Sequence, residues 1–233
     1  MNIALFGYGK MGKAIEKIAI KKGHKVVLKI SSKSKDYTLN NVDVAIDFSL
    51  PKVAFNNIKM CLKNGVPVIS GTTGWLDKYN EIVSICKKNN GTFLYASNFS
   101  LGVNIFFELN EKLAVMMKNY GEYLPVIEEI HHKQKLDAPS GTAISLAKPI
   151  LKNFNKDKWV LGVTSNKKEL PIFAKREDDV PGTHIVKYVS KIDEIEIKHT
   201  AKNREGFALG AVIAAEFVAD KKGIFTMKDV LGL

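Results

Sequence analysis

One short stretch of the chain, residues 129–143, carries an unusual density of reactive side chains. Two adjacent histidines, His131 and His132, can exchange a proton near neutral pH because an imidazole titrates close to it. Lys135 adds a fixed positive charge four residues after His131. The segment Pro139-Ser140-Gly141-Thr142 then leads into a helical run, whose first N–H groups would form an anion site. A proton donor, a cation and an anion cradle together indicate an enzyme that acts on a small carboxylated substrate.

Other polar side chains near this stretch have less defined roles. Lys133 alternates away from His132 in an extended segment, so we expect it to be solvated. Asp137 could orient a histidine or cap the turn before Ala138-Pro139, and we favour the turn. Three further side chains remain open between a structural role and a role near the substrate: His184, His199 and Arg204.

A second motif, Gly7-Tyr8-Gly9-Lys10-Met11-Gly12, follows the first predicted strand directly and opens a helix. It has the spacing and the context of the phosphate-binding turn of dinucleotide-binding domains. Gly7 permits the tight turn, Gly9 lets the backbone approach a pyrophosphate, and Gly12 lets helix and strand pack closely. We therefore predict that these six residues hold a dinucleotide.

The second predicted strand ends without the acidic residue that commonly receives the ribose hydroxyls of NAD. Ser31 and Lys33 stand there instead, within Ile30-Ser31-Ser32-Lys33-Ser34-Lys35. Hydroxyls and lysines can accept a 2′-phosphate, so the cluster favours NADPH over NADH; the alternative is a solvated loop.

Two more loops are expected at the carboxyl edge of the sheet, where ligands collect in such folds. Gly71-Thr72-Thr73-Gly74 follows the fourth strand, and Ala96-Ser97-Asn98-Phe99 follows the fifth. Either could be a plain loop. Their recurrence at one edge favours contacts with the nicotinamide half of a cofactor.

The first hundred residues alternate strand and helix patterns, which predicts a parallel sheet with helices on its faces. The expected strands are Asn2–Phe6, Lys25–Ile30, Val42–Phe48, Val66–Ser70 and Thr92–Ala96. The expected helices begin in the glycine turn, at Pro51 and at Leu76.

After residue 100 the pattern changes to a mixed α+β type. We expect a helix over Val103–Asn119 with Phe106, Leu109, Leu113, Met116 and Met117 as its apolar contacts. A strand over Pro125–His132 delivers the histidines. The segments Thr183–Val189 and Ile195–Thr200 form an antiparallel hairpin, and Gly206–Ala219 forms the final helix.

Composition limits the possible classes of protein. The 233 residues are 45% hydrophobic and 25% charged, which is typical of a soluble globular protein. The net charge of +11 fits a nucleic-acid partner, an anionic substrate or a lysine-rich surface, and the scattered lysine doublets favour the surface. Only Cys61 and Cys86 are present, so no disulfide framework is expected. Without a signal-peptide pattern or a membrane-spanning run, we expect a cytoplasmic protein.

The histidine stretch resembles the signature of a known family. Glu129-x-His131-His132-x-x-Lys135-x-Asp137-Ala138-Pro139-Ser140-Gly141-Thr142-Ala143 is similar to the signature of the dihydrodipicolinate reductases (4-hydroxy-tetrahydrodipicolinate reductases). Further matches follow in order along nearly the whole chain: Gly7-x-Gly9-x-Met11-Gly12, Ala45-Ile46-Asp47-Phe48-Ser49, Gly71-Thr72-Thr73-Gly74, Asn98-Phe99-Ser100-x-Gly102-Val103, Gly182-x-His184 and His199-x-Ala201-x-x-Arg204-x-x-Phe207-Ala208-x-Gly210-Ala211. The chain departs from the family pattern in the missing acidic residue near Ser31 and in a short middle region.

The resemblance implies an α/β fold with two domains. A Rossmann-type parallel-sheet dinucleotide-binding domain would comprise residues 1–102 and 207–233. An α+β domain with a mixed sheet, residues 103–206, would be inserted to bind substrate and to form oligomers. It also implies a homotetramer that assembles through the sheet of the inserted domain.

The family's activity implies hydride transfer from NADPH or NADH to a cyclic imine or enamine dicarboxylate in lysine and diaminopimelate synthesis, with no metal. His131 would be the proton donor and acceptor, and Lys135 a proton donor and substrate contact. His132, Gly141 and Thr142 would bind the substrate. The cofactor would contact residues Gly7 to Gly12, Gly71 to Thr73 and Ala96 to Phe99.

Two alternatives stand beside this interpretation. Another two-domain nicotinamide-dependent dehydrogenase of amino-acid metabolism explains the glycine turn but not the tandem histidines joined to Ser140-Gly141-Thr142. A nucleotide-sensing, nucleic-acid-binding regulator requires a clustered basic face or a recognition helix, and the sequence shows neither clearly. We expect neither a nucleic acid nor a membrane as partner.

Overall fold

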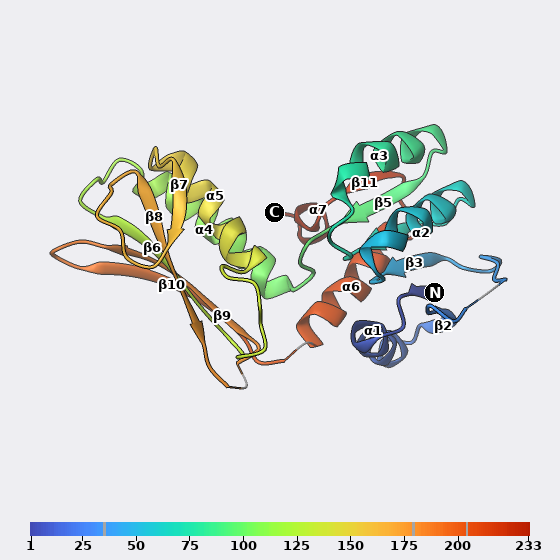
Figure 1. Ribbon diagram of the computed structural model, residues 1–233. Helices are drawn as coiled ribbons and strands as arrows, with labels where there is room; N and C mark the ends of the chain where they lie inside the picture. The colour runs from blue at the N-terminus through green and yellow to red at the C-terminus, as the bar shows by residue number, and fades with distance from the viewer. Residues whose placement is uncertain (35, 179, 204) are drawn as a thin grey trace. The chain divides into compact units, whose positions relative to one another are not determined.

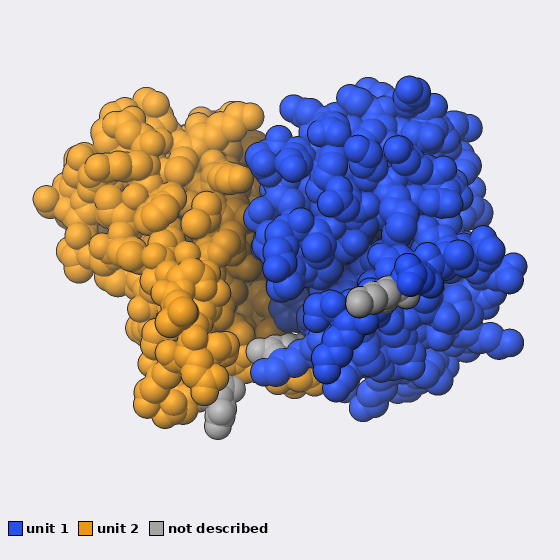
Figure 2. All heavy atoms as spheres, turned by 45° about the vertical axis from the view of Figure 1, so that its right-hand side comes forward, with its two compact units in different colours: residues 1–101, 205–233 blue, residues 102–204 orange. Residues whose placement is uncertain are grey.

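The structure, a computed structural model, describes residues 1–34, 36–178, 180–203 and 205–233, so Arg204 lies outside the described residues. The chain divides into two compact units (Figure 2). Unit 1 comprises residues 1–101 and 205–233, and unit 2 comprises residues 102–204. Unit 2 is thus an insertion in the sequence of unit 1.

Unit 1 is built on one six-stranded parallel sheet in the order β11-β5-β4-β3-β1-β2 (Figure 1). Its strands are β1 (Asn2–Phe6), β2 (Lys25–Ile30), β3 (Val44–Asp47), β4 (Val68–Ser70), β5 (Thr92–Tyr95) and β11 (Gly223–Phe225). Its helices are α1 (Lys10–Lys21), α2 (Pro51–Lys63), the 3₁₀ helix η1 (Leu76–Lys78), α3 (Tyr79–Lys88), α6 (Glu205–Val218) and α7 (Met227–Leu231).

The central strands of this sheet are apolar on both faces, because helices cover both. In β1, Ile3 and Leu5 pack with α1 and α6, whereas Ala4 and Phe6 pack with α2 and α3. A continuous apolar run is what a parallel strand buried on both sides requires. The thiol of Cys61 is buried within the second cluster, as expected, and both cysteines are free.

The strand order positions the ligand crevice of unit 1. From β1 the chain continues outward to β2 on one side, and it then crosses to β3 on the other side. In open parallel sheets such a switch of direction leaves a crevice at the carboxyl ends of the two strands. The carboxyl ends of β1 and β3 are therefore the place in unit 1 where a ligand would bind.

Unit 2 is a mixed five-stranded sheet in the order β10-β9-β6-β8-β7. Its strands are β6 (Leu124–His131), β7 (Lys158–Leu161), β8 (Glu169–Arg176), β9 (Gly182–Val189) and β10 (Glu194–Ala201). The central strand β6 pairs parallel to β8 and antiparallel to β9. Helices α4 (Leu101–Met117) and α5 (Gly141–Asn153) supply side chains to the apolar core that the described residues of this unit form.

Several elements differ from the sequence-based expectation. Strands β7, β8 and β11 and helix α7 were not predicted, so the helix over residues 206–219 is not the final one. Strand β6 ends at His131 and leaves His132 outside the sheet. In β8, Leu170 and Ile172 are both buried and alternate as strand residues do. Pro171 lies between them, and because proline is rare inside strands, the sequence did not indicate a strand here.

Helix α4 buries only part of the apolar face expected for it. Phe106 and Met117 are buried, but Leu109 is 51% exposed and Met116 is 68% exposed. The buried residues of α4 are Val103, Phe106, Asn110, Ala114 and Met117. They form one stripe along the helix, and a helix that packs against one sheet buries only such a stripe. No helix in the described part of the chain is long and apolar enough to cross a membrane.

We predict that the packing of α6 in unit 1 requires glycine at one position. A Cβ atom at Gly210 would lie 1.7 Å from the backbone oxygen of Phe99, so backbone would have to move. Gly210→Ala should lower the free energy of unfolding by about 1–3 kcal/mol, measured by chemical denaturation. Gly206→Ala on the same helix is the control, because its Cβ would meet nothing closer than 3.7 Å. Equal stability of the two variants would contradict this account of α6.

Candidate active site

The glycine turn of unit 1 connects β1 to α1 in a conformation that glycine favours. Gly7 has a φ of 93°, and a Cβ atom there would lie 2.1 Å from the carbonyl oxygen of Phe48. A Cβ atom at Gly12 would lie 2.4 Å from the carbonyl oxygen of Gly7. Gly9 is the N-cap of α1 without any side-chain cap, and the space around its Cα is open. The first N–H groups of α1 are thus available to an anion.

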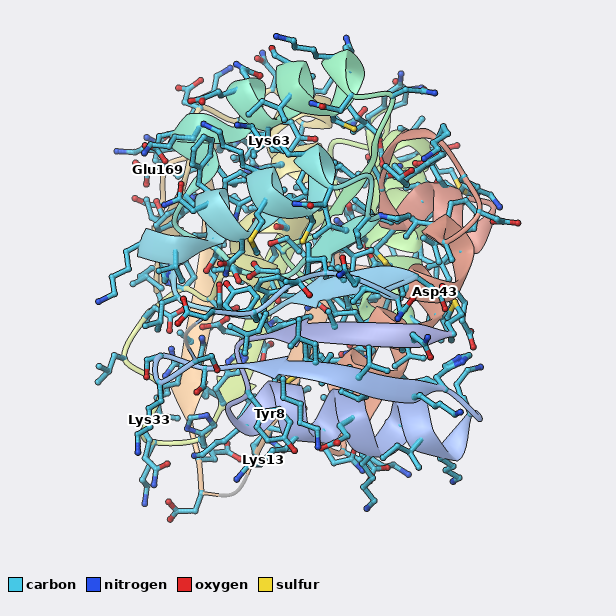
Figure 3. All side chains as sticks on the ribbon, turned by 90° about the vertical axis from the view of Figure 1, so that its right-hand side faces the viewer. Tyr8, Lys13, Lys33, Asp43, Lys63 and Glu169 are labelled. Carbon is cyan, nitrogen blue, oxygen red and sulfur yellow. The ribbon has the colours of Figure 1, made fainter. Side chains whose placement is uncertain are left out.

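Charged side chains surround the outer part of this turn. The hydroxyl of Tyr8 donates to Glu16, whose other oxygen lies 2.5 Å from Nζ of Lys29. The ammonium of Lys29 also lies 5.3 Å from the centre of the Tyr8 ring. Lys33 is exposed just beyond β2 and forms no ion pair among the described residues, while its N–H donates to Oγ of Ser31. Tyr8, Lys13 and Lys33 lie at one end of the sheet, with Asp43 at the opposite end (Figure 3).

The loop after β4 lines a cavity of about 190 Å³ at this same carboxyl edge. Its walls are formed by Met11, Phe48, Ser49, Pro51, Gly71, Thr72 and Thr73. A Cβ atom at Gly71 would lie 2.4 Å from the Phe48 ring, so the ring would have to shift. After β5, the Phe99 ring packs on Phe48 with ring centres 5.5 Å apart. The structure therefore brings the glycine turn and the loops after β4 and β5 to one edge of unit 1.

Strand β6 of unit 2 turns two of its polar side chains toward the helices. Burial alternates along the strand, so Pro125, Ile127, Glu129 and His131 face inward. Glu129 is fully buried and His131 is 6% exposed. A buried carboxylate is costly unless it is paired and hydrogen-bonded, so its partners decide the local structure.

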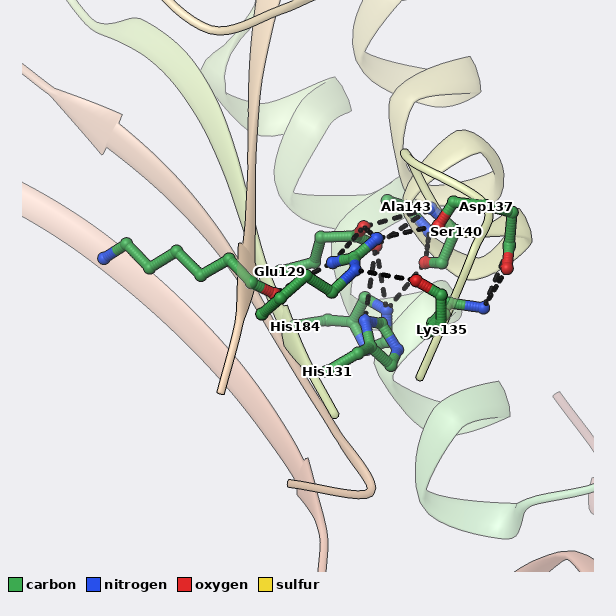
Figure 4. A network of polar contacts seen from close by, with 9 residues as sticks. Glu129, His131, Lys135, Asp137, Ser140, Ala143 and His184 are labelled. Carbon is green, nitrogen blue, oxygen red and sulfur yellow. Dashed lines mark hydrogen bonds and ion pairs between the residues drawn. The ribbon is translucent and has the colours of Figure 1, made fainter. Parts of the chain in front are cut away.

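Ser140 joins this carboxylate to the start of α5 (Figure 4). Its N–H donates to both oxygens of Glu129, at 3.1 and 3.0 Å. Its hydroxyl oxygen accepts from the N–H of Ala143 at 3.1 Å and thereby caps the helix. The next residues, Gly141 and Thr142, begin α5 beside this network, and the space around Gly141 is open. The expected anion cradle is thus a capped helix start, at which the cap already uses the N–H of Ala143.

Arg176 of β8 is the residue that sequence reasoning missed. It stands opposite His131 in the pairing of β6 with β8. Both terminal nitrogens of its guanidinium lie 3.4 Å from Oε1 of Glu129, and one donates at 2.7 Å to the carbonyl oxygen of Asp137. The alternation of buried positions in β8 was the available signal, but the strand itself was not recognised.

Lys135 and Asp137 form an ion pair with each other. The ammonium of Lys135 contacts both carboxylate oxygens of Asp137 at 2.8 Å. The turn-capping role that we favoured for Asp137 stays a prediction beside this ion pair. The hydrogen bonds from Lys135 hold the pKa of Asp137 below its usual value. Lys133 is exposed, as expected, and pairs with Asp178 at 2.7 Å.

Two histidines meet at the Glu129 carboxylate. Nδ1 of His131 and Nε2 of His184 lie 3.8 and 3.7 Å from the same oxygen, and the two rings are 4.9 Å apart. The pKa of His184 is lowered to about 3 by burial and by the neighbouring His131 and His199, so its ring is neutral. Nε2 of His184 lies 3.1 Å from the Ser140 hydroxyl. His184 therefore supports the network as a neutral ring.

The charge state of His131 depends on opposing neighbours. Burial lowers the pKa of its imidazole, and the cations of Lys135 and Arg176 lower it further, whereas Glu129 raises it. Gly182 leaves room for the ring, since a Cβ atom there would lie 3.1 Å from Nε2. A dianionic ligand near the ring would add negative charge and favour the imidazolium form.

The other candidate histidines lie outside this cluster of contacts. His132 follows β6 and is half-buried, and its Nδ1 has no hydrogen-bond partner among the described residues. His199 stands opposite His184 on β10, where its ring packs over Gly102. A Cβ atom at Gly102 would lie 2.9 Å from Nε2 of His199, so a larger residue there would make the ring shift.

Glu129, His131 and His184 also offer three ligand atoms within 4.8 Å of one another. A metal ion fits this group poorly on electrostatic grounds. The carboxylate already accepts hydrogen bonds from Ser140 and Arg176, and the Arg176 and Lys135 side chains would repel a further cation. The expectation of a reaction without a metal remains a prediction.

Comparison with known proteins decides the family. Residues 1–99 match the family model of the dihydrodipicolinate reductase N-terminus, and residues 102–231 match that of its C-terminus. The chain belongs to the dihydrodipicolinate reductase family. It is 60% identical to a 4-hydroxy-tetrahydrodipicolinate reductase of Christiangramia forsetii over 99% of this chain and 98% of that protein. A reductase of the same name from Methanocaldococcus jannaschii is 39% identical over 82% of this chain and 72% of its own length.

Solved structures agree on the fold. A dipicolinate-bound dihydrodipicolinate reductase from Paenisporosarcina sp. TG-14 is similar with a TM-score of 0.77 and 23% identity, over 97% of each chain. Family membership makes this chain a nicotinamide-dependent oxidoreductase, which confirms the fold class and the enzyme class expected from the sequence. The two alternative interpretations, a different dehydrogenase and a nucleic-acid-binding regulator, are therefore set aside.

We predict that the charge of Glu129 raises the pKa of His131. Glu129→Gln keeps the shape of the side chain but removes its charge, so the pKa of His131 should fall further below its ordinary value. Titration of the ring by nuclear magnetic resonance measures this directly. Glu128→Gln is the control, because Glu128 pairs with Lys187 at 3.2 Å instead of contacting His131. An unchanged or raised pKa of His131 in the Glu129 variant would contradict the assignment.

Proposed function

We propose that this enzyme reduces 4-hydroxy-tetrahydrodipicolinate, or its dehydrated ring, to tetrahydrodipicolinate with NADPH or NADH in lysine and diaminopimelate synthesis. Unit 1 would bind the dinucleotide and unit 2 the substrate. The observation that carries this proposal is the buried network that joins His131 to the start of α5 through Glu129 and Ser140. It supports the proposal because the proposed proton donor and the proposed anion cradle would then lie within the same unit.

The substrate would be held by opposite charge and by N–H groups. It is a small ring with two carboxylates, which need cations or donors when they leave water. Lys135 already holds the two oxygens of one carboxylate, that of Asp137, at 2.8 Å, so the same head group suits a substrate carboxylate. Gly141 and Thr142 would offer the N–H groups of α5 to the other. His132, next to the strand end, would complete the substrate contacts.

His131 would supply the proton of the reaction. A bound nicotinamide supplies the hydride, and the reduced ring then carries excess electron density that needs a proton. In the free enzyme, burial keeps the pKa of His131 below its ordinary value. Two substrate carboxylates would favour the imidazolium, so substrate binding and protonation of His131 support each other.

The cofactor would occupy the carboxyl edge of unit 1. The open space at Gly9 and the uncapped N–H groups of α1 suit a pyrophosphate, which supports binding by Gly7, Tyr8, Gly9, Lys10, Met11 and Gly12. The residues that would contact the nicotinamide half are Gly71, Thr72, Thr73, Ala96, Ser97, Asn98 and Phe99. Met11, Gly71, Thr72 and Thr73 share the walls of one cavity.

We favour NADPH as the cofactor because of the cations near the end of β2. Lys29 is engaged by Glu16, whereas the exposed Lys33 forms no ion pair within the described parts of the chain. Lys33, with the hydroxyl of Ser31, is therefore available to a 2′-phosphate. An acidic side chain, which would repel that phosphate, is absent at Ser31.

The enzyme would assemble into a homotetramer through the sheet of unit 2. The α4–α5 core contacts one face of this sheet, and the other face carries the half-buried apolar residues Val126, Ile130 and Phe173. On that face, Nζ of Lys187 lies 3.2 Å from Glu128 and 3.3 Å from Glu196. An apolar face with paired charges suits contact with a second copy of the same sheet.

We predict different kinetic effects for the two proposed catalytic residues. His131→Ala should lower kcat by about 10²–10⁴-fold, the usual contribution of a general acid, with NADPH binding unchanged. Lys135→Ala should chiefly raise KM for the ring substrate, because it removes a carboxylate contact. Steady-state assays that follow NADPH absorbance with freshly generated substrate measure both. A normal kcat for His131→Ala, or a normal KM for Lys135→Ala, would contradict the assigned role.

We predict that Lys33 contributes to cofactor choice. Lys33→Ala should weaken NADPH binding by about tenfold, a typical loss for one charge-assisted contact, and leave NADH binding unchanged. The ratio of kcat/KM for the two cofactors measures the effect. Lys25→Ala at the opposite end of β2 is the matched control. An equal loss with NADPH and NADH would remove Lys33 from the 2′-phosphate site.

A further inference from the structure

Asp47 is a buried carboxylate for which the proposed reaction has no direct use. It is the last residue of β3, at the switch in strand order, and it is fully buried. It forms no ion pair with the described residues. A carboxylate buried in this way would be strongly destabilising unless hydrogen bonds replace its water.

Four side chains supply those hydrogen bonds. Oδ1 accepts from the hydroxyl of Ser49 at 2.6 Å and from the amide of Asn57 at 3.2 Å. Oδ2 accepts from the hydroxyls of Ser70 at 2.9 Å and Thr72 at 2.7 Å. These donors come from the loop after β3, from α2, from the end of β4 and from the loop after β4. One carboxylate thus ties together β3, α2, the end of β4 and the loop after β4 at the carboxyl edge of the sheet.

Two of the hydroxyls have their orientation decided by a second contact. The hydroxyl oxygen of Thr72 accepts from the N–H of Ser49 at 2.9 Å, and that of Ser49 accepts from the amide of Asn57 at 3.1 Å. Their protons are therefore free to point to the oxygens of Asp47. Three of the four donors, Ser49, Asn57 and Thr72, therefore direct a proton at Asp47, which favours its ionised form. Burial raises the pKa of Asp47, and the hydrogen bonds oppose that effect.

The held residues are those that shape the cavity of unit 1. Ser49 and Thr72 both line it, with Gly71 and Thr73 on either side of Thr72. The carbonyl oxygen of Thr72 accepts at 2.7 Å from the indole of Trp75, which fixes the peptide group that follows. The loop 71–73 therefore owes its form to Asp47 on one side and to Trp75 on the other.

We propose that Asp47 is a positioning residue for the cofactor, which holds Ser49 and Thr72 so that the loop 71–73 presents its backbone to the nicotinamide half. The proposal rests on the proposed function, since it assumes that this loop contacts NADPH. It assigns Asp47 no contact with cofactor or substrate. It acts on the cofactor site through the hydroxyl groups of Ser49 and Thr72, which donate hydrogen bonds to its carboxylate.

Replacement of the carboxylate by an amide tests this role. Asp47→Asn turns one acceptor into a donor that faces two of the four donor groups, whichever way the amide is placed, so the network must rearrange. The dissociation constant for NADPH, measured by fluorescence on the full chain, should rise roughly tenfold. KM for NADPH should rise in parallel, while kcat at saturating cofactor changes less than about twofold, because positioning for binding is lost and not the chemistry.

The matched control is the residue just before the start of β3. Asp43→Asn also removes a carboxylate that accepts a hydrogen bond, from the N–H of Asn2 at 2.6 Å, but far from the crevice (Figure 3). It should leave the dissociation constant for NADPH unchanged. Ser70→Ala is a milder variant in case Asp47→Asn fails to fold: it removes one of the four donors, lies outside the cavity wall and should weaken NADPH binding by about threefold.

A double-mutant cycle separates positioning from general destabilisation. Thr72→Val should weaken NADPH binding in the natural protein but add little in the Asp47→Asn background, because both act through one contact. Additive effects of the two changes, or a lowered melting temperature with an unchanged dissociation constant for NADPH, would overturn the role of Asp47. Failure of the unaltered enzyme to bind NADPH or NADH would instead overturn the proposed function.

Discussion

The active-site structure of unit 2 depends on one buried charge, the carboxylate of Glu129. It lies on the inner face of β6, where no water reaches it, and it is satisfied by the N–H of Ser140 and by the guanidinium of Arg176. Because loss of Arg176 would leave the buried charge without this cation, and loss of the Ser140 contact would remove a hydrogen bond from it, the carboxylate fixes the start of α5 and the end of β8 relative to β6. The proposed proton donor and the proposed anion cradle therefore share a common anchor.

Unit 1 solves a similar problem by other means. Asp47 ends a central strand as Glu129 nearly ends β6, and each holds two neighbouring segments in place. Glu129 has a cationic partner, so its charge is balanced, and its field raises the pKa of His131. Asp47 is hydrogen-bonded only by neutral hydroxyl and amide groups, so no cation balances its charge among these contacts.

The sequence allowed prediction of the parts of the site that are local in the chain. The glycine turn, the order of strands and helices in the first hundred residues and the family signature around His131 all depend on spacings of a few residues. The contacts of Arg176 with Glu129 and of Thr72 with Asp47 join residues 47 and 25 positions apart, which no periodicity encodes. Strand β8 was not predicted because Pro171 lies within it. The ion pair of Asp137 with Lys135 depends on the conformation of the turn between β6 and α5. The residues that hydrogen-bond to each buried carboxylate could therefore not be predicted from the sequence.

The central claim is that His131, held at the Glu129 network, gives the proton that completes hydride transfer. Isotope effects on His131→Gln test it most directly, with NADPH deuterated at the transferred position and with the reaction run in heavy water. If His131 is the donor, the variant should show a larger solvent isotope effect on kcat and a smaller effect from the deuterated nicotinamide, because protonation has become limiting. Isotope effects equal to those of the unaltered enzyme would contradict the claim.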